Sequence, residues 1–164
     1  VTRGERLIKK VYETIRNSPH WNDSLLVVTF DEHGGFYDHA TPPAAVPPGD
    51  TFTPSYIKNH FKFDRLGVRV PALVISPWIK AGTIDHTVYD HTSCLATMQR
   101  LYGMSPLTER DKAANDFNHL FGLAAPRNDA PSRLPNVANS GFVCEDDGDT
   151  VGETSEGLAR LPCS

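Results

Sequence analysis

Apolar positions near the start of the chain recur at helical spacing. They lie three or four residues apart, as on one face of a helix: Leu7, Ile8, Val11 and Ile15. Thr2 and Glu5 have the spacing of a capping box at the start of this segment. Pro19 ends it, because proline has no backbone N–H to donate. The pattern therefore predicts an amphipathic helix before Pro19.

Two later runs of apolar residues have the length of strands. They are Leu25–Phe30 and Val70–Ser76. The first is apolar on both faces, which is typical of a buried strand in a sheet covered on both sides. Residues 40–69 between them hold five prolines and are predicted to be a long loop. The order helix, strand, loop, strand, helix indicates an α/β fold with parallel pairing of the two strands.

Two further helices are expected after the second strand. Thr92 or Ser93 can cap the first of them, and Gly103 is placed to end it. Its inner face is expected to carry the apolar residues Leu95, Met98 and Leu101. Thr108 begins a shorter helix, with Asp111 well placed to interact with its N-terminus.

Composition and charge narrow the class of protein. With 39% hydrophobic and 22% charged residues, the 164-residue chain resembles a globular domain. No apolar run approaches the length that spans a bilayer, so no transmembrane segment is expected. Net charge is −4 and there is no lysine or arginine block, so no nucleic-acid partner is expected.

The end of the chain differs from the rest. Only 7 of the 41 residues from Ala124 onward are Leu, Ile, Val or Phe. We therefore predict a folded part at residues 1–123 and an extended or disordered acidic tail at residues 124–164. Cys144 and Cys163 in this tail could pair or stay reduced, and Cys94 falls in a predicted helix. Because two strands alone do not make a stable sheet, the chain is expected to be part of a larger α/β domain.

The segment from Asp31 to His39 holds most of the candidate chemistry. Its five potential ligands or acid–base groups directly follow a predicted strand, where sites form in open α/β sheets: Asp31, Glu32, His33, Asp38 and His39. Adjacent Asp31 and Glu32 repel each other as bare anions and call for a cation or a shared proton. Carboxylates favour Mg, Ca or Mn, whereas imidazoles would admit Zn or Fe. The alternative is a solvated loop whose acids and histidines cap turns.

Two glycines follow the acidic pair closely, and a second polar cluster lies further along the chain. Gly34 and Gly35 allow a sharp turn, which lets the two carboxylates converge. The second cluster, residues 85–91, lies between the second strand and the following helix. There His91 can reach into a cleft, whereas His86 is interpreted as a surface residue. Three other histidines, isolated in the sequence, are interpreted as structural or exposed: His20, His60 and His119.

Three stretches in order closely resemble the phosphoesterase family of bacteria, fungi and plants. They are Ser18–His39, which contains Asp-Glu-His-Gly-Gly, then Gly67–Trp78, then Tyr89–Ser93, and the resemblance covers about residues 4–122. The family includes phospholipases C and related acid phosphatases. The resemblance implies an alkaline-phosphatase-like α/β/α sandwich, present here only as a C-terminal part with an irregular tail. It also implies hydrolysis of phosphate esters through a Ser or Thr nucleophile and a metal.

The resemblance also assigns roles to residues. It implies that Asp31 and Glu32 ligate a divalent metal ion and that His91 contacts the phosphate or leaving group. His33 and His39 are weaker candidates that would orient the carboxylates. The family's nucleophile and its Glu-Asn ligands lie in an N-terminal half that has no counterpart here, and this chain contains no Glu-Asn pair.

Two hypotheses about function follow. The first is a phospholipase C-like hydrolase acting on a phospholipid or another phosphate ester, with the missing N-terminal half as a possible partner. The second is a catalytically inactive truncated product that binds a cation or a partner. Head group, metal identity and compartment are left open; family members are often secreted, but nothing in this chain demonstrates secretion.

Overall fold

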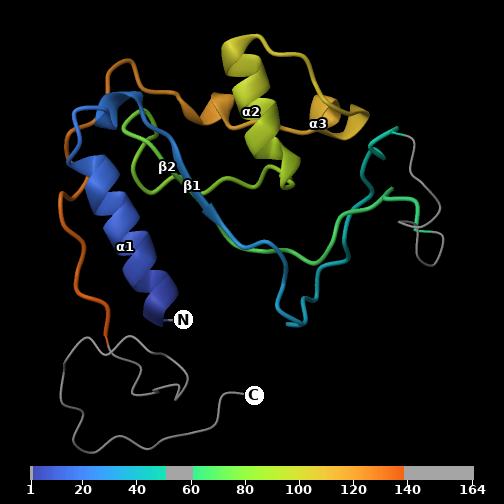
Figure 1. The fold of residues 1–164 in the computed structure, drawn as a ribbon, viewed down its shortest axis with the longest axis horizontal. Coiled ribbons are helices and arrows are strands. Elements are labelled where there is room, and N and C mark those ends of the chain that lie inside the picture. Colours follow the sequence, from blue (N-terminus) through green and yellow to red (C-terminus); the bar gives the residue numbers. More distant parts are fainter. Residues whose placement is uncertain (1, 51–60, 139–164) are drawn as a thin grey trace, which may run out of the picture. The chain divides into compact units, whose positions relative to one another are not determined.

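The computed structural model describes residues 2–50 and 61–138. The chain divides into two compact units, residues 18–130 and residues 1–17 together with 131–164. Figure 1 labels the helices and strands of both units. No helix in the described ranges is both long and apolar enough to cross a membrane.

The unit that contains the chain's start is built on helix α1, Thr2–Arg16, as the apolar spacing predicts. Residues 131–134 contact this helix through hydrogen bonds. The Tyr12 hydroxyl donates to the Pro131 oxygen at 2.7 Å, and Lys9 Nζ donates to the Leu134 oxygen at 2.7 Å. The Leu134 amide in turn donates to Glu13 Oε1 at 2.7 Å. Residues 131–134, which belong to the predicted tail, are therefore hydrogen-bonded to α1.

The other unit contains a two-stranded sheet of β1, Leu26–Thr29, and β2, Ala72–Ile75. The strands pair antiparallel, with Leu26 opposite Ile75 and Thr29 opposite Ala72. The prediction of parallel pairing is wrong. A parallel pair needs a crossover, usually a helix, that returns the chain to the same end of the sheet. The described residues between these strands contain no helix, and the chain simply reverses direction.

The expectation that the first strand is buried on both faces is also wrong. Residues 26–28 of β1 are only half-buried and Thr29 is exposed, while Leu73 of β2 is 56% exposed. An apolar strand pattern indicates which faces need to be covered, not what covers them. The described residues cover these strands only in part. The structure is therefore mixed α and β with a small antiparallel sheet, and the complete sandwich stays a prediction.

Helix α2, Thr92–Tyr102, ends where the sequence indicates. Gly103 adopts a left-handed conformation with φ of 64°, and the Met104 amide donates to the Gln99 oxygen at 2.8 Å. The predicted caps at Thr92 or Ser93 are wrong, because Asp90 accepts from the Thr92 amide at 2.7 Å instead. Helix α3, Glu109–Ala113, has the capping box expected of Thr108 and Asp111. Short 3₁₀ turns occupy Trp21–Asp23 (η1) and Asn118–Leu120 (η3).

The face of α2 that packs inward is polar. The predicted inner residues Leu95, Met98 and Leu101 are between 42% and 53% exposed, so that prediction is wrong. Ser93, Ala96, Thr97 and Gln99 are buried instead. Gln99 Nε2 donates to Asp111 Oδ2 at 2.7 Å, and Thr97 Oγ1 accepts from the Phe117 amide at 3.0 Å. Hydrogen bonds therefore set the orientation of α2 against α3 and η3, and Figure 1 shows α2 beside α3.

Some predictions concern residues outside the described ranges. They are the pairing of Cys144 with Cys163, the surroundings of His60 and the disorder expected of residues 139–164, and they stay predictions. The boundary at residue 123 lies inside the described part and also stays a prediction. Within the described part, Cys94 lies in α2, as expected, and it is a free thiol.

Candidate functional site

The acidic pair lies in a tight turn directly after β1. Gly34 and Gly35 have φ of 63° and 76°, a region that residues with a side chain rarely adopt. The Phe36 amide donates to the His33 oxygen at 3.1 Å and closes the turn. The two glycines therefore reverse the chain at the end of the strand, as the sequence indicates.

Asp31 and Glu32 are exposed, and each uses one carboxylate oxygen to stabilise the turn. Asp31 Oδ1 accepts from the Glu32 amide at 3.0 Å, and Glu32 Oε2 accepts from the Gly34 amide at 2.8 Å. Among the described residues, Asp31 Oδ2 and Glu32 Oε1 have no hydrogen-bond partner. This geometry accommodates both interpretations made from the sequence: the acids cap their own turn, and each keeps one oxygen for a ligand.

These two residues fit a divalent metal as part of a larger ligand set. Their oxygens are the donors that Mg, Ca and Mn prefer. However, no group of three or more His, Cys, Asp or Glu side chains within residues 2–50 and 61–138 is placed to hold a metal ion. Two carboxylates supply fewer ligands than the six or so that such ions take. The metal-binding role of Asp31 and Glu32 stays a prediction.

His33 has a buried nitrogen next to this pair. Its Nδ1 atom is buried, and no partner for it exists in the described part of the chain. An unpaired buried polar atom costs about 1–3 kcal/mol, so structures rarely keep one without a ligand, ion or water to satisfy it. The orphaned nitrogen makes His33 the histidine of this turn with capacity for a further contact.

His91 connects the second polar cluster to the acidic turn. Its Nε2 atom lies 2.8 Å from the backbone oxygen of Phe30, the residue before Asp31. Because a carbonyl oxygen can only accept, Nε2 carries the proton and Nδ1 is left for another contact. His91 therefore lies at the carboxyl end of β1, although it is 61 residues away from Phe30 in the sequence.

Asp38 and His39 have different surroundings. Asp38 accepts two hydrogen bonds from Arg69, at 2.6 and 2.9 Å, and the Arg69 guanidinium lowers the pKa of this carboxyl well below its usual range. His39 is 87% exposed at its side chain and lies 3.6 Å from Asp38. The Arg69 pair ties the end of the Asp31–His39 segment to the residues before β2. Sequence reasoning missed it because spacing along the chain does not reveal a partner 31 residues away.

His119 is isolated in the sequence but not in space. Its Nε2 atom lies 3.1 Å from Asp85 Oδ2 and 3.2 Å from the Tyr89 hydroxyl. His86 is exposed, as expected. The structure therefore adds His119 to the residues of the second polar cluster.

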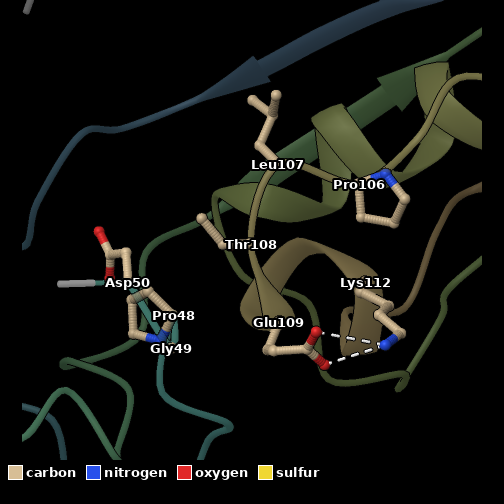
Figure 2. A pocket seen from close by; sticks show the side chains of 8 residues that line it. All are labelled: Pro48, Gly49, Asp50, Pro106, Leu107, Thr108, Glu109 and Lys112. Atoms are coloured by element: carbon tan, nitrogen blue, oxygen red, sulfur yellow. Dashed lines mark hydrogen bonds and ion pairs between the residues drawn. The ribbon is translucent and has the colours of Figure 1, made fainter.

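A shallow pocket of about 340 Å³ lies away from the predicted site residues, between residues 48–50 and the start of α3. Figure 2 shows its eight lining residues, of which Glu109 and Lys112 form an ion pair at 3.1 Å. The rest of the lining combines the Asp50 carboxylate and Thr108 with apolar residues. None of the predicted site residues lines it.

Comparison with known proteins supports the resemblance seen in the sequence. The sequence pattern of the Phosphoesterase family matches residues 1–105. Non-specific phospholipase C6 of Arabidopsis thaliana is 46% identical over 150 residues, which cover 84% of this chain and 29% of that protein. Non-specific phospholipase C3 of the same plant is 44% identical over 147 residues, covering 84% and 28%.

A bacterial protein is similar as well. The non-hemolytic phospholipase C of Pseudomonas aeruginosa is 34% identical over 145 residues, covering 77% of this chain and 21% of that protein. The chain thus spans less than a third of the length of these relatives. The matched region contains β1, the acidic turn, β2 and α2. The chain belongs to the Phosphoesterase family.

Proposed function

We propose that this chain contributes part of the active site of a phospholipase C-like enzyme that hydrolyses the phosphate ester of a phospholipid. The observation that carries the proposal is the turn after β1. There Asp31 and Glu32 each present an exposed carboxylate oxygen that has no partner within residues 2–50 and 61–138, inside the region that matches the family. The relatives named phospholipase C supply the substrate class.

The acidic pair, His33 and His91 have separate tasks in this proposal. Asp31 and Glu32 hold a divalent cation, which when bound polarises a phosphoryl oxygen and stabilises developing negative charge. His33 contributes Nδ1 as an orienting contact next to the carboxylates. His91 presents Nδ1 to the phosphate or the leaving group, since Nε2 is engaged by Phe30. The Ser or Thr nucleophile lies outside this chain, in a further part of the catalytic domain.

A second candidate function is binding without catalysis. It is favoured by the exposed apolar residues of β2 and α2, such as Leu73 and Leu101, which another part of a domain or a partner would cover. In this case the acidic turn binds a cation, or merely caps itself, and no ester is cleaved.

Hydrolysis of bis-p-nitrophenyl phosphate and of phosphatidylcholine vesicles distinguishes the two candidates. The native protein, purified from its source with an antibody to this chain, is first weighed intact by mass spectrometry and then assayed with and without a chelator. The proposal requires hydrolysis that the chelator abolishes and that added divalent metal restores. Metal-replete protein that cleaves neither substrate would support the binding function instead.

A further inference from the structure

Asp85, Tyr89 and His119 form a compact hydrogen-bonded cluster that no predicted role accounts for. The Tyr89 hydroxyl donates to Asp85 Oδ2, and His119 Nε2 lies 3.1 Å from the same oxygen. The other oxygen, Oδ1, accepts from the amide and hydroxyl of Thr87 at 3.2 and 3.0 Å. Asp85 is therefore the centre of the cluster, with both carboxylate oxygens engaged.

The contacts define the protonation state of each member. The hydrogen bond from Tyr89 holds the pKa of the Asp85 carboxyl well below its usual range, so it is an anion at neutral pH. Burial and the neighbouring Asp85 raise the pKa of Tyr89, which keeps it a phenol and a donor. Because an ionised carboxylate only accepts, His119 carries a proton on Nε2.

Ring packing fixes the cluster to the interior of its unit. The Tyr89 ring lies 4.8 Å from the ring of Phe117, which is buried, and stacks at 13° on the His119 ring. His119 belongs to η3, whereas Asp85 and Tyr89 belong to the loop between β2 and α2. The cluster therefore joins this loop to the segment after α3.

The same loop ends at His91, and it is held at several consecutive residues. Asn115 Nδ2 donates to the Val88 oxygen at 2.8 Å, and Arg110 Nη1 lies 3.5 Å from Asp90 Oδ2. Consecutive Cα atoms are about 3.8 Å apart, so fixing Tyr89 confines the backbone of His91, two residues later, to a small volume. From that volume His91 reaches the Phe30 oxygen, next to the acidic turn.

We propose that Asp85, Tyr89 and His119 form a clamp that positions His91 at the carboxyl end of β1, with His119 as a positioning residue for the candidate site. The clamp acts through the backbone of residues 89–91 and touches no substrate. Its importance for turnover rests on the proposed function, but the positioning of His91 does not.

The variants His119→Ala and His119→Gln test this clamp in the 164-residue chain. Glutamine keeps an Nε2–H donor for Asp85, whereas alanine does not. NMR of the ¹⁵N-labelled imidazoles reports which His91 nitrogen carries the proton. The wild type and His119→Gln should show His91 protonated on Nε2, and His119→Ala should show both tautomers. His86→Ala, an exposed histidine in the same loop, is the matched control and should leave His91 unchanged.

A His91 signal that is identical in wild type and His119→Ala would overturn the proposal. So would mixed His91 tautomers in His119→Gln, which should keep the proton on Nε2. If His119→Ala does not fold, Tyr89→Phe decides the question. It keeps the ring against Phe117 and removes only the hydroxyl donor to Asp85, so it should also produce mixed His91 tautomers. Unchanged tautomers in that variant contradict the proposal.

Kinetics separate the clamp from the proposed function. In protein that hydrolyses phosphate esters, His119→Ala should lower kcat about tenfold to a hundredfold, as misplacement of a catalytic group does, with KM little changed. His119→Gln should recover most of this loss. Absence of all hydrolysis would count against the proposed function alone, because the NMR result still tests the position of His91.

Discussion

His91 Nε2 lies 2.8 Å from the backbone oxygen of Phe30 and brings the loop before α2 to the end of β1. Replacing His91 by Ala removes this contact. Since the bond lies at an exposed position, the free energy of unfolding should fall by only about 0.5–1.5 kcal/mol. Amide hydrogen exchange at residues 31–35 should nevertheless become faster, because the turn loses its neighbour. Unchanged exchange in that turn would show that the contact does not order it. His20→Ala is the control, an exposed histidine outside the site.

The buried carboxylate of Asp111 should be a major source of stability for α2 and α3. Asp111 is 2% exposed and accepts hydrogen bonds from the Gln99 side chain and the amides of Leu107 and Thr108, at 2.7–2.8 Å. Asp111→Ala leaves these donors without an acceptor, so unfolding in urea should show a loss of about 2–4 kcal/mol. Glu109→Ala, which breaks an exposed ion pair, should cost less than about 1 kcal/mol.

The same carboxylate should make stability depend on pH. Burial alone would raise the pKa of Asp111, but the hydrogen bonds from Thr108, Gln99 and the nearby amides outweigh it and lower the pKa. The folded pKa lies below the unfolded value of about 4, so the stabilisation is present above that value and is lost as pH falls toward the folded pKa. Asp111→Asn should therefore lose less stability than wild type between about pH 5 and pH 2. Equal losses, measured by urea unfolding across that range, would contradict the assignment.

Thr97 and Met98 are neighbours in α2, but substitution should destabilise the protein only at Thr97. Thr97 is buried and its hydroxyl accepts from the Phe117 amide, so Thr97→Val should cost about 1–3 kcal/mol of unfolding free energy. Met98 is half exposed, and Met98→Gln should change stability by no more than about 0.5 kcal/mol. Thermal unfolding of both variants checks the orientation of the helix. A large loss for Met98→Gln would mean that the apolar face is covered.

Features that depend on neighbours in sequence were predictable. The end of α2 at Gly103 needs only a residue that tolerates the left-handed region, and the cap of α3 needs only Thr108 and Asp111 at the right spacing. The turn at Gly34 and Gly35 follows from the same local reasoning. These elements are specified by contacts within a few residues, which a single sequence displays.

Features that depend on distant partners were not predictable from the pattern. Strand direction depends on the path between β1 and β2, and apolar residues do not encode it. The inner face of α2 is chosen by hydrogen bonds to Asp111 and Phe117, which apolar periodicity cannot reveal. In the candidate site, the acidic pair could be singled out because it is contiguous in the sequence, whereas His119 lies 34 residues from Asp85.

Metal content and turnover of the Asp31→Ala variant test the central claim most directly. Both are measured in the native-length protein, with bis-p-nitrophenyl phosphate as substrate and Asp23→Ala, an exposed acid outside the turn, as control. Since metal-held charge stabilisation contributes several kcal/mol to such reactions, Asp31→Ala should lose bound metal and lower turnover by orders of magnitude, while Asp23→Ala stays near wild type. Near-normal turnover with normal metal content in Asp31→Ala would contradict the assignment of the acidic turn as a metal site.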